Sequence, residues 1–247
     1  MSNTIKRINA ITSLKFQTIL SNLSMMSNPI IALTIVLVFR RVMANLPQAN
    51  GVFRVDAFLL GLGLIMNIVS GGLMISSTSI AEEKEKHTLR VLMTSSVKSN
   101  EYLIGSLIPT FMIIMIVNLL LIPASGISYS AIHIPTFLLI TAGGTLISII
   151  FGFIVGIVTK DQTESGVTST PILLVFTMLP QLRFFSETIN KVSSYTYSGV
   201  IASYVDGIFS KDGYILNVQD LVTMATWFIV GIAIFIIAYK KRGMESD

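Results

Sequence analysis

Long stretches without a charged residue constrain this chain more than any other feature. Residues 57–81 and 102–159 contain no Asp, Glu, Lys or Arg. Charged residues make up 12% of the chain, whereas soluble domains average about 25%. A helix needs about 20 consecutive apolar residues to cross a bilayer. The sequence therefore predicts an all-α polytopic membrane protein, built as a single domain over residues 1–247.

Six apolar stretches are expected to cross the membrane as helices. Their predicted ranges are 28–46, 57–81, 102–124, 134–159, 167–182 and 221–239. Eleven of the 17 lysine and arginine residues share one side if that side holds both termini, the segment after the second span and Lys160. Because cytoplasmic loops carry the excess of basic residues, we expect both termini in the cytoplasm. Arg40 and Arg41, near the far end of the first span, run against this rule.

Residues 3–24 are expected to form an amphipathic helix at the cytoplasmic face of the membrane. Most of their apolar side chains share one sector of a helical wheel, although Ile11 and Leu14 interrupt the pattern. Such a helix either touches a partner or only anchors the chain in the headgroup layer. The residues that we single out on it are Lys6, Arg7, Lys15 and Phe16.

The segment 183–220 is too polar to span and is rich in aromatic residues. This composition favours the membrane interface, and we predict an extracellular re-entrant segment before the last span. The short polar stretch 160–166 is predicted to be a turn.

Small and amide side chains inside the predicted spans indicate close helix packing. Asn67 and Asn118 either hydrogen bond between helices or contact a substrate. The fourth span carries a small residue at every fourth position, which forms a smooth ridge for packing within the subunit or for a dimer seam. The ridge consists of Gly144, Ser148, Gly152 and Gly156.

Catalytic chemistry has little support in this sequence. No phosphate-binding G-x-x-x-x-G-K-[ST] motif occurs, and neither His87 nor His133 belongs to an H-E-x-x-H pair. The chain has no cysteine, and its net charge of +4 needs no nucleic-acid partner. The predicted spans also lack the Asp, Glu, Lys and His residues that a proton relay requires. We therefore predict no catalytic residue, metal site or bound cofactor, and an energy source outside this chain.

The charged segment from Glu82 to Ser106 is where that energy source is expected to act. It lies between the second and third spans, and a short cytoplasmic helix there could transmit a conformational change from a partner. Apolar side chains would dock in a groove of the partner, and charged ones would orient them. An ordinary solvated loop is the alternative. The candidate coupling residues are Glu83, Glu85, His87, Thr88, Leu89, Arg90, Leu92 and Met93.

The same segment resembles the signature of ABC-2 type transporter permeases, which reads E-x-E-x-G-T-L-x-x-L, then T-P-V and E-x-x-x-G-K. The departures are His87 for the usual Gly, Ser96 for the usual Pro and Ser106 for the usual Lys. The residues in step are Glu83, Glu85, Thr88, Leu89, Leu92, Ser95, Val97, Glu101 and Gly105.

This resemblance implies the transmembrane subunit of an ATP-driven exporter in a bacterial plasma membrane. Two permease chains, identical or homologous, would pair above two ABC ATPase subunits that bind ATP and Mg²⁺. Apolar walls and short loops favour an amphipathic peptide or a hydrophobic drug as substrate. Three alternatives stay open: export of a lipid-linked glycan, a sodium-coupled or facilitative carrier that works without an ATPase, and a scaffold or sensor subunit that transports nothing.

Overall fold

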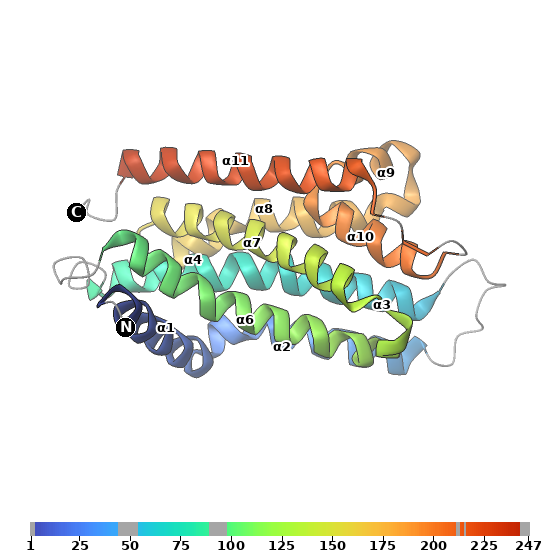
Figure 1. Cartoon of the computed structure of the whole chain (residues 1–247), viewed down its shortest axis with the longest axis horizontal. Helices are drawn as coiled ribbons and strands as arrows, with labels where there is room; N and C mark the ends of the chain where they lie inside the picture. The colour runs from blue at the N-terminus through green and yellow to red at the C-terminus, as the bar shows by residue number, and fades with distance from the viewer. Residues whose placement is uncertain (1–2, 44–53, 89–97, 211–212, 215, 243–247) are drawn as a thin grey trace.

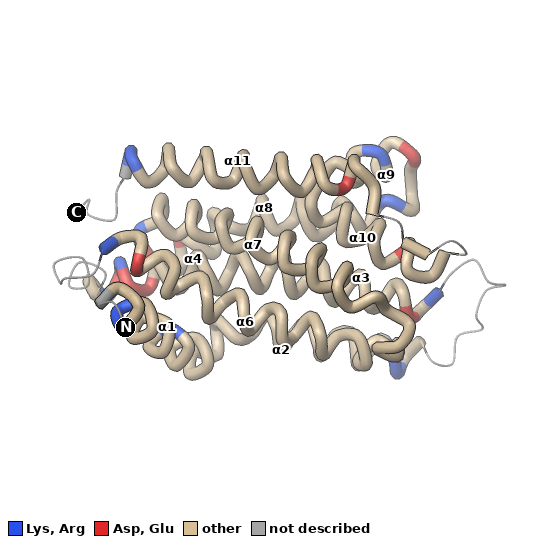
Figure 2. The backbone as a smooth tube through the Cα atoms, in the orientation of Figure 1, with Lys and Arg blue, Asp and Glu red and all other residues tan. Residues whose placement is uncertain are grey.

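The computed structural model describes residues 3–43, 54–88, 98–210, 213–214 and 216–242, and this part of the chain is helical with no strand. The longer helices lie side by side in an elongated bundle, with both termini at the same end (Figure 1). Lys, Arg, Asp and Glu gather at the two ends of the bundle, and its middle is almost free of them (Figure 2). This distribution fits helices that cross an apolar layer between two aqueous phases.

Six helices in the described ranges are long and apolar enough to cross a membrane, which equals the predicted number. They are α2 (Leu23–Met43), the continuous helix α3–η1–α4 (Val55–Ile65, Met66–Gly71 and Gly72–Glu85), α6 (Ser99–Ser125), α7 (Ile134–Val158), α8 (Gln162–Leu182) and α11 (Val218–Arg242). An N-terminal helix, α1 (Asn3–Ser21), precedes them. The predicted end of the first span at residue 46 lies outside the described residues.

The helix from Val55 to Glu85 lies at the centre of the bundle and is its most buried span. Its middle segment, η1, is a π-helix, a feature that its apolar sequence did not predict. Asn67 in η1 donates hydrogen bonds to the Ile114 carbonyl at 3.0 Å and to Asn118 Oδ1 at 2.8 Å. The two amides therefore hydrogen bond between helices, which was one of the two predicted roles.

The ridge on α7 packs against the central helix within the subunit. A Cβ atom at Gly152 would lie 2.5 Å from the Leu73 carbonyl oxygen of α4, so only glycine permits this approach. Gly156 meets Ile80 and the Ser77 carbonyl in the same way, and Ser148 lies against Gly72. Gly144 faces Ile68 of η1 and Ile201 of α10 (Tyr197–Ile208).

Helix α8 begins earlier than the sequence predicted. The stretch 160–166 was expected to be a turn, but residues 162–166 form the start of α8. Asp161 is the reason, because its side chain caps the helix by accepting a hydrogen bond from the Glu164 N–H at 2.8 Å.

Residues 183–208 form three short helices at the end of the bundle away from the termini (Figure 1). They are η3 (Arg183–Phe185), α9 (Glu187–Ser194) and α10. Helix α10 is largely buried and packs against α3, α7 and α8. Arg183, which directly follows α8, pairs with Asp206 of α10 at 2.7 Å. Whether α10 re-enters a bilayer stays a prediction.

Arg40 has a structural role at this same end. Its guanidinium donates hydrogen bonds to the Pro123 and Ala124 carbonyls at 3.0 and 3.4 Å, in the last turn of α6. Carbonyls there have no intrahelical donor, and a cation is favoured beside them. Because Pro123 has no N–H, it leaves the Leu119 carbonyl unpaired, and the Tyr129 hydroxyl donates to that carbonyl at 3.0 Å. Arg40 and Tyr129 thus supply hydrogen-bond donors to carbonyls near the C-terminal end of α6.

Candidate functional site

The last turn of α4 carries four consecutive charged residues, Glu82 to Glu85, which we call the α4 hub. Consecutive residues of an α-helix point about 100° apart, because a turn contains about 3.6 residues. The four consecutive charged side chains therefore point away from the helix axis in different directions. At this end of the bundle α4 is surrounded by α6, α7 and α8, with α1 beside α6 (Figure 1).

Glu83 is bound to a buried lysine from the N-terminal helix. Lys15 is 2% exposed, and its ammonium lies 2.8 Å from Glu83 Oε1 and 2.8 Å from the Ser79 hydroxyl oxygen. The Tyr102 hydroxyl, 3.3 Å from the ammonium, donates to the other carboxylate oxygen of Glu83. Burial lowers the pKa of Lys15 from its usual 10.5, and the Glu83 carboxylate opposes that shift. This cluster joins α1, α4 and α6.

Lys84 and Glu85 reach helices on other sides of α4. The Lys84 ammonium donates to the Ile157 carbonyl at 2.8 Å and to the Thr159 carbonyl, and so caps the C-terminal end of α7. Glu85 accepts hydrogen bonds at 3.3 Å from the backbone N–H and the side-chain amide of Gln162, the first residue of α8.

Glu82 completes the α4 hub at the junction between α1 and α2. One of its carboxylate oxygens accepts from the Asn22 side-chain amide at 3.1 Å, and the other pairs with Lys86 one turn further along the chain. The α4 hub therefore contacts α1, α6, α7, α8 and the α1–α2 junction through one turn of helix.

Helix α1 packs tightly along α6. A Cβ atom at Gly105 would lie 2.8 Å from the Ile11 Cβ, so the missing side chain lets the two helices touch. Ile11 is buried at this contact, although the helical wheel placed it outside the apolar sector. That prediction was wrong because the wheel sorts residues by polarity alone. The buried face carries Lys15 between Ile11 and Ile19, and apolar residues such as Leu20 remain exposed.

The other residues predicted on α1 lie in different environments. Arg7 is partly exposed and pairs with Glu101 of α6 at 3.6 Å. Phe16 is partly buried against the hydrophobic core, and Lys6 is exposed.

The chain leaves α4 through a left-handed residue. His87 has φ of +57°, a region that is strained for most side chains and free for glycine. Thr88 donates from its hydroxyl to the Glu83 carbonyl at 3.3 Å. His87 and Thr88 are exposed. The remaining predicted coupling residues, Leu89, Arg90, Leu92 and Met93, lie outside the described residues.

A comparison with protein families decides the identity of this bundle. The family described as ABC-2 family transporter protein matches residues 2–239, almost the whole chain. The chain belongs to this family. No curated protein matches it in sequence. It is therefore a multi-pass membrane protein and a subunit of an ABC transporter, and membership in the ABC-2 family implies an ABC ATPase as its partner.

The left-handed residue, His87, stands at a position of the signature described above. The resemblance noted above has glycine at the position of His87, and glycine is the residue that adopts positive φ at least cost. This chain has histidine there, with φ of +57°, and histidine is enriched in the left-handed region among non-glycine residues.

The sequence did not identify Lys15 as a partner of Glu83, nor Tyr102 as part of the cluster. Glu83 was expected to orient a partner protein, yet in the described chain its carboxylate points inward to Lys15. One signal was available. Lys15 lies four residues from both Ile11 and Ile19, which places it on their side of a helix.

Proposed function

We propose that this chain is the permease subunit of an ATP-driven exporter that moves amphipathic peptides or hydrophobic drugs out of the cell. Two permease chains pair in the bacterial plasma membrane, with their termini in the cytoplasm. A separate ABC ATPase binds ATP and Mg²⁺ and docks on the segment that follows the α4 hub. This chain then needs no catalytic or metal-binding residue of its own.

The observation that supports this proposal is the set of contacts made by the α4 hub. A movement of the docking segment pulls first on the last turn of α4, because the chain continues directly from one to the other. From there Glu83 acts on α1 and α6, Lys84 on α7 and Glu85 on α8. Ion pairs and hydrogen bonds with two discrete arrangements can carry such coupling between rigid helices. A single contact can thereby rearrange four helices together.

The substrate class rests on the chemistry of the bundle. The described spans are apolar along their middle portions, where the few buried amides already hydrogen bond to one another. Apolar walls suit apolar side chains or rings better than the many hydroxyl groups of a glycan.

Transport by the reconstituted complex tests the proposal. The chain and its cognate ABC ATPase are placed in vesicles, and ATP-dependent movement of an amphipathic peptide and of a hydrophobic dye is measured. We expect movement of either with ATP and none without it. Glu85→Gln together with Leu89→Ala should abolish transport and the stimulation of ATP hydrolysis. Glu187→Gln, an exposed change at the opposite end, serves as the control.

Three results would contradict the proposal. Transport that follows a sodium gradient without ATPase would indicate a carrier. Movement of a lipid-linked glycan, with neither peptide nor dye moved, would overturn the substrate class. Binding of the ATPase without any transport would indicate a scaffold or sensor.

A further inference from the structure

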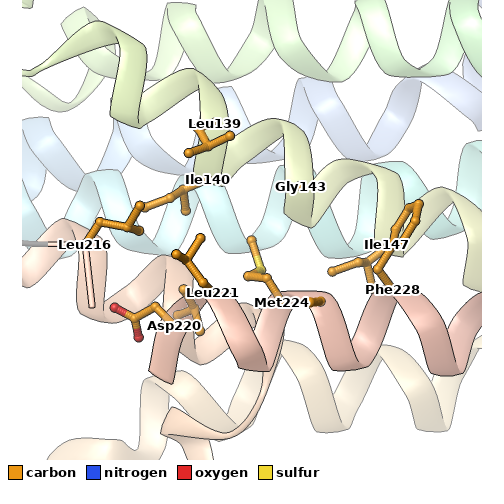
Figure 3. A pocket seen from close by; sticks show the side chains of 11 residues that line it. Leu139, Ile140, Gly143, Ile147, Leu216, Asp220, Leu221, Met224 and Phe228 are labelled. Carbon is orange, nitrogen blue, oxygen red and sulfur yellow. The ribbon is translucent and has the colours of Figure 1, made fainter. Parts of the chain in front are cut away.

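A cavity opens on the surface of the bundle between α7, α10 and α11 (Figure 3). Its volume is about 260 Å³. Ile140, Ile147 and Val200 form its buried floor, whereas Leu139 and Leu221 are exposed at its rim. Because α7 and α11 are candidate spans, the opening lies on a face that a bilayer would cover.

The shape of this cavity fits one alkyl chain. The lining residues run along α11 from Asp220 to Phe228 (Figure 3), and eight residues of helix extend about 12 Å. An apolar cavity of about 150 Å³ accepts benzene. This one is less than twice that volume over such a length, and it is smaller than the roughly 300–1,000 Å³ typical of drug-sized ligands. It therefore has room for a single extended chain and not for a bulky ring system or a peptide.

Asp220 gives the cavity one polar end. The carboxylate lies beside Leu216 and Leu221, at the end opposite Ile147 and Phe228 (Figure 3). Asp220 is 8% exposed, and the Tyr214 hydroxyl donates to it at 2.7 Å. Within the described ranges no lysine or arginine lies within ion-pair distance of this carboxylate. A buried carboxylate favours a cation and repels a phosphate.

A second cavity of about 260 Å³ is lined by Tyr214, the residue that donates to Asp220. Tyr204 lines it together with His133 and Thr136, which form a hydrogen bond at 2.7 Å. Tyr204 is 1% exposed, and its hydroxyl has no hydrogen-bond partner among the described residues. Among the residues that line the apolar cavity, Asp220 is the one with a polar side chain.

We infer that the cavity between α7, α10 and α11 binds a cationic amphiphile with one alkyl chain, whose ammonium group pairs with Asp220. The chain occupies the apolar length beside Met224 and Phe228. This site requires a membrane around the bundle, and it does not require the ATPase. It therefore stands apart from the proposed export function, and each can fail without the other.

Photolabelling in nanodiscs tests the site. The probe is dodecylamine with a photoreactive diazirine in its chain, and the full-length protein is held in phosphatidylcholine. We expect labels on peptides of α7 and α11. Asp220→Asn keeps the acceptor for Tyr214 but removes the charge, and it should weaken labelling about tenfold, as expected for the loss of a hydrogen-bonded charge pair. The corresponding alcohol probe should label weakly and equally in both proteins.

A filling variant provides independent evidence. Gly143 lines the cavity, and only Met224 lies near a Cβ placed there. Gly143→Leu should abolish labelling by filling the space. Gly231→Leu changes the same α7–α11 contact against Ile150, outside the cavity, and should leave labelling intact.

The inference is overturned if the amine and the alcohol label equally, if Gly143→Leu has no effect in a protein of unchanged thermal stability, or if excess phosphatidylethanolamine competes as well as the amine does. The last result would identify a bilayer lipid as the occupant.

Discussion

Replacing Lys15 with methionine tests whether α1 is held to the α4 hub. Methionine has an unbranched apolar side chain that matches lysine as far as Cε, with sulfur in place of one methylene, and it lacks the ammonium. The side chains of Lys15 and Glu83 are 2% and 14% exposed, so the change leaves a nearly buried carboxylate without its cation. Removing one partner of a buried ion pair costs about 3–5 kcal/mol. For a chain of this size that corresponds to a melting temperature roughly 6–20 °C lower.

The double variant Lys15→Met/Glu83→Met separates the pair from the packing around it. With both charges gone, no unpaired ion stays buried, and replacing a whole buried pair by apolar residues is often nearly neutral. Tyr102 loses its acceptor on Glu83, which costs about 1–3 kcal/mol because its side chain is buried. The double variant should therefore be more stable than Lys15→Met alone.

Thermal unfolding in detergent, followed by the fluorescence of Trp227, measures these differences. Lys6→Met makes the same chemical change at an exposed position of the same helix and should shift the melting temperature by no more than about 2 °C, since surface changes stay within about 0.5 kcal/mol. The reasoning is refuted if Lys15→Met behaves like Lys6→Met, or if the double variant is less stable than Lys15→Met.

Two other features can be tested separately. His87→Gly should raise the free energy of unfolding by about 0.5–1 kcal/mol. Relieving the left-handed conformation of a non-glycine residue gains about 1–2 kcal/mol, and the added chain entropy of glycine costs about 0.5–1 kcal/mol. Denaturant unfolding measures this difference, and a lower stability of the variant would refute the claim that His87 is strained. A Cβ at Gly61 would lie 3.9 Å from the Val205 Cβ, within the disulfide range of about 3.5–4.5 Å, so the two cysteine substitutions should cross-link α3 to α10 in this cysteine-free chain. Gly166→Cys with Val205→Cys should not cross-link, because nothing lies within 4 Å of a Cβ at Gly166.

Much of the architecture could be predicted from the sequence because it depends on composition. Uninterrupted apolar runs predicted the number of spans. Small residues at every fourth position predicted the close packing of α7, which contacts the central helix. Interhelical hydrogen bonding was one of the two roles predicted for Asn67 and Asn118, since an amide in an apolar span needs a partner. These features require only a local pattern and the properties of a bilayer.

The candidate site could be predicted only in part because its contacts join distant segments. A run of charges indicated where α4 leaves the apolar layer, but polarity alone could not show that Glu83 faces Lys15, 68 residues earlier in the chain. Likewise, Arg40 looked like an exception to the distribution of basic residues until its contact with the end of α6 was known. No residue pattern distinguishes the π-helix at residues 66–71 from the α-helix on either side of it, so the sequence could not predict it.

ATP hydrolysis by the assembled transporter tests the role of the α4 hub most directly. The rate of the cognate ABC ATPase is measured alone and with the parent chain, with Lys15→Met/Glu83→Met, and with Arg183→Met/Asp206→Met, which removes an ion pair at the opposite end. We expect all three chains to assemble with the ATPase, and the parent and the Arg183 variant to stimulate hydrolysis. Lys15→Met/Glu83→Met should bind the ATPase and fail to stimulate it. Full stimulation by that variant would contradict transmission through the α4 hub.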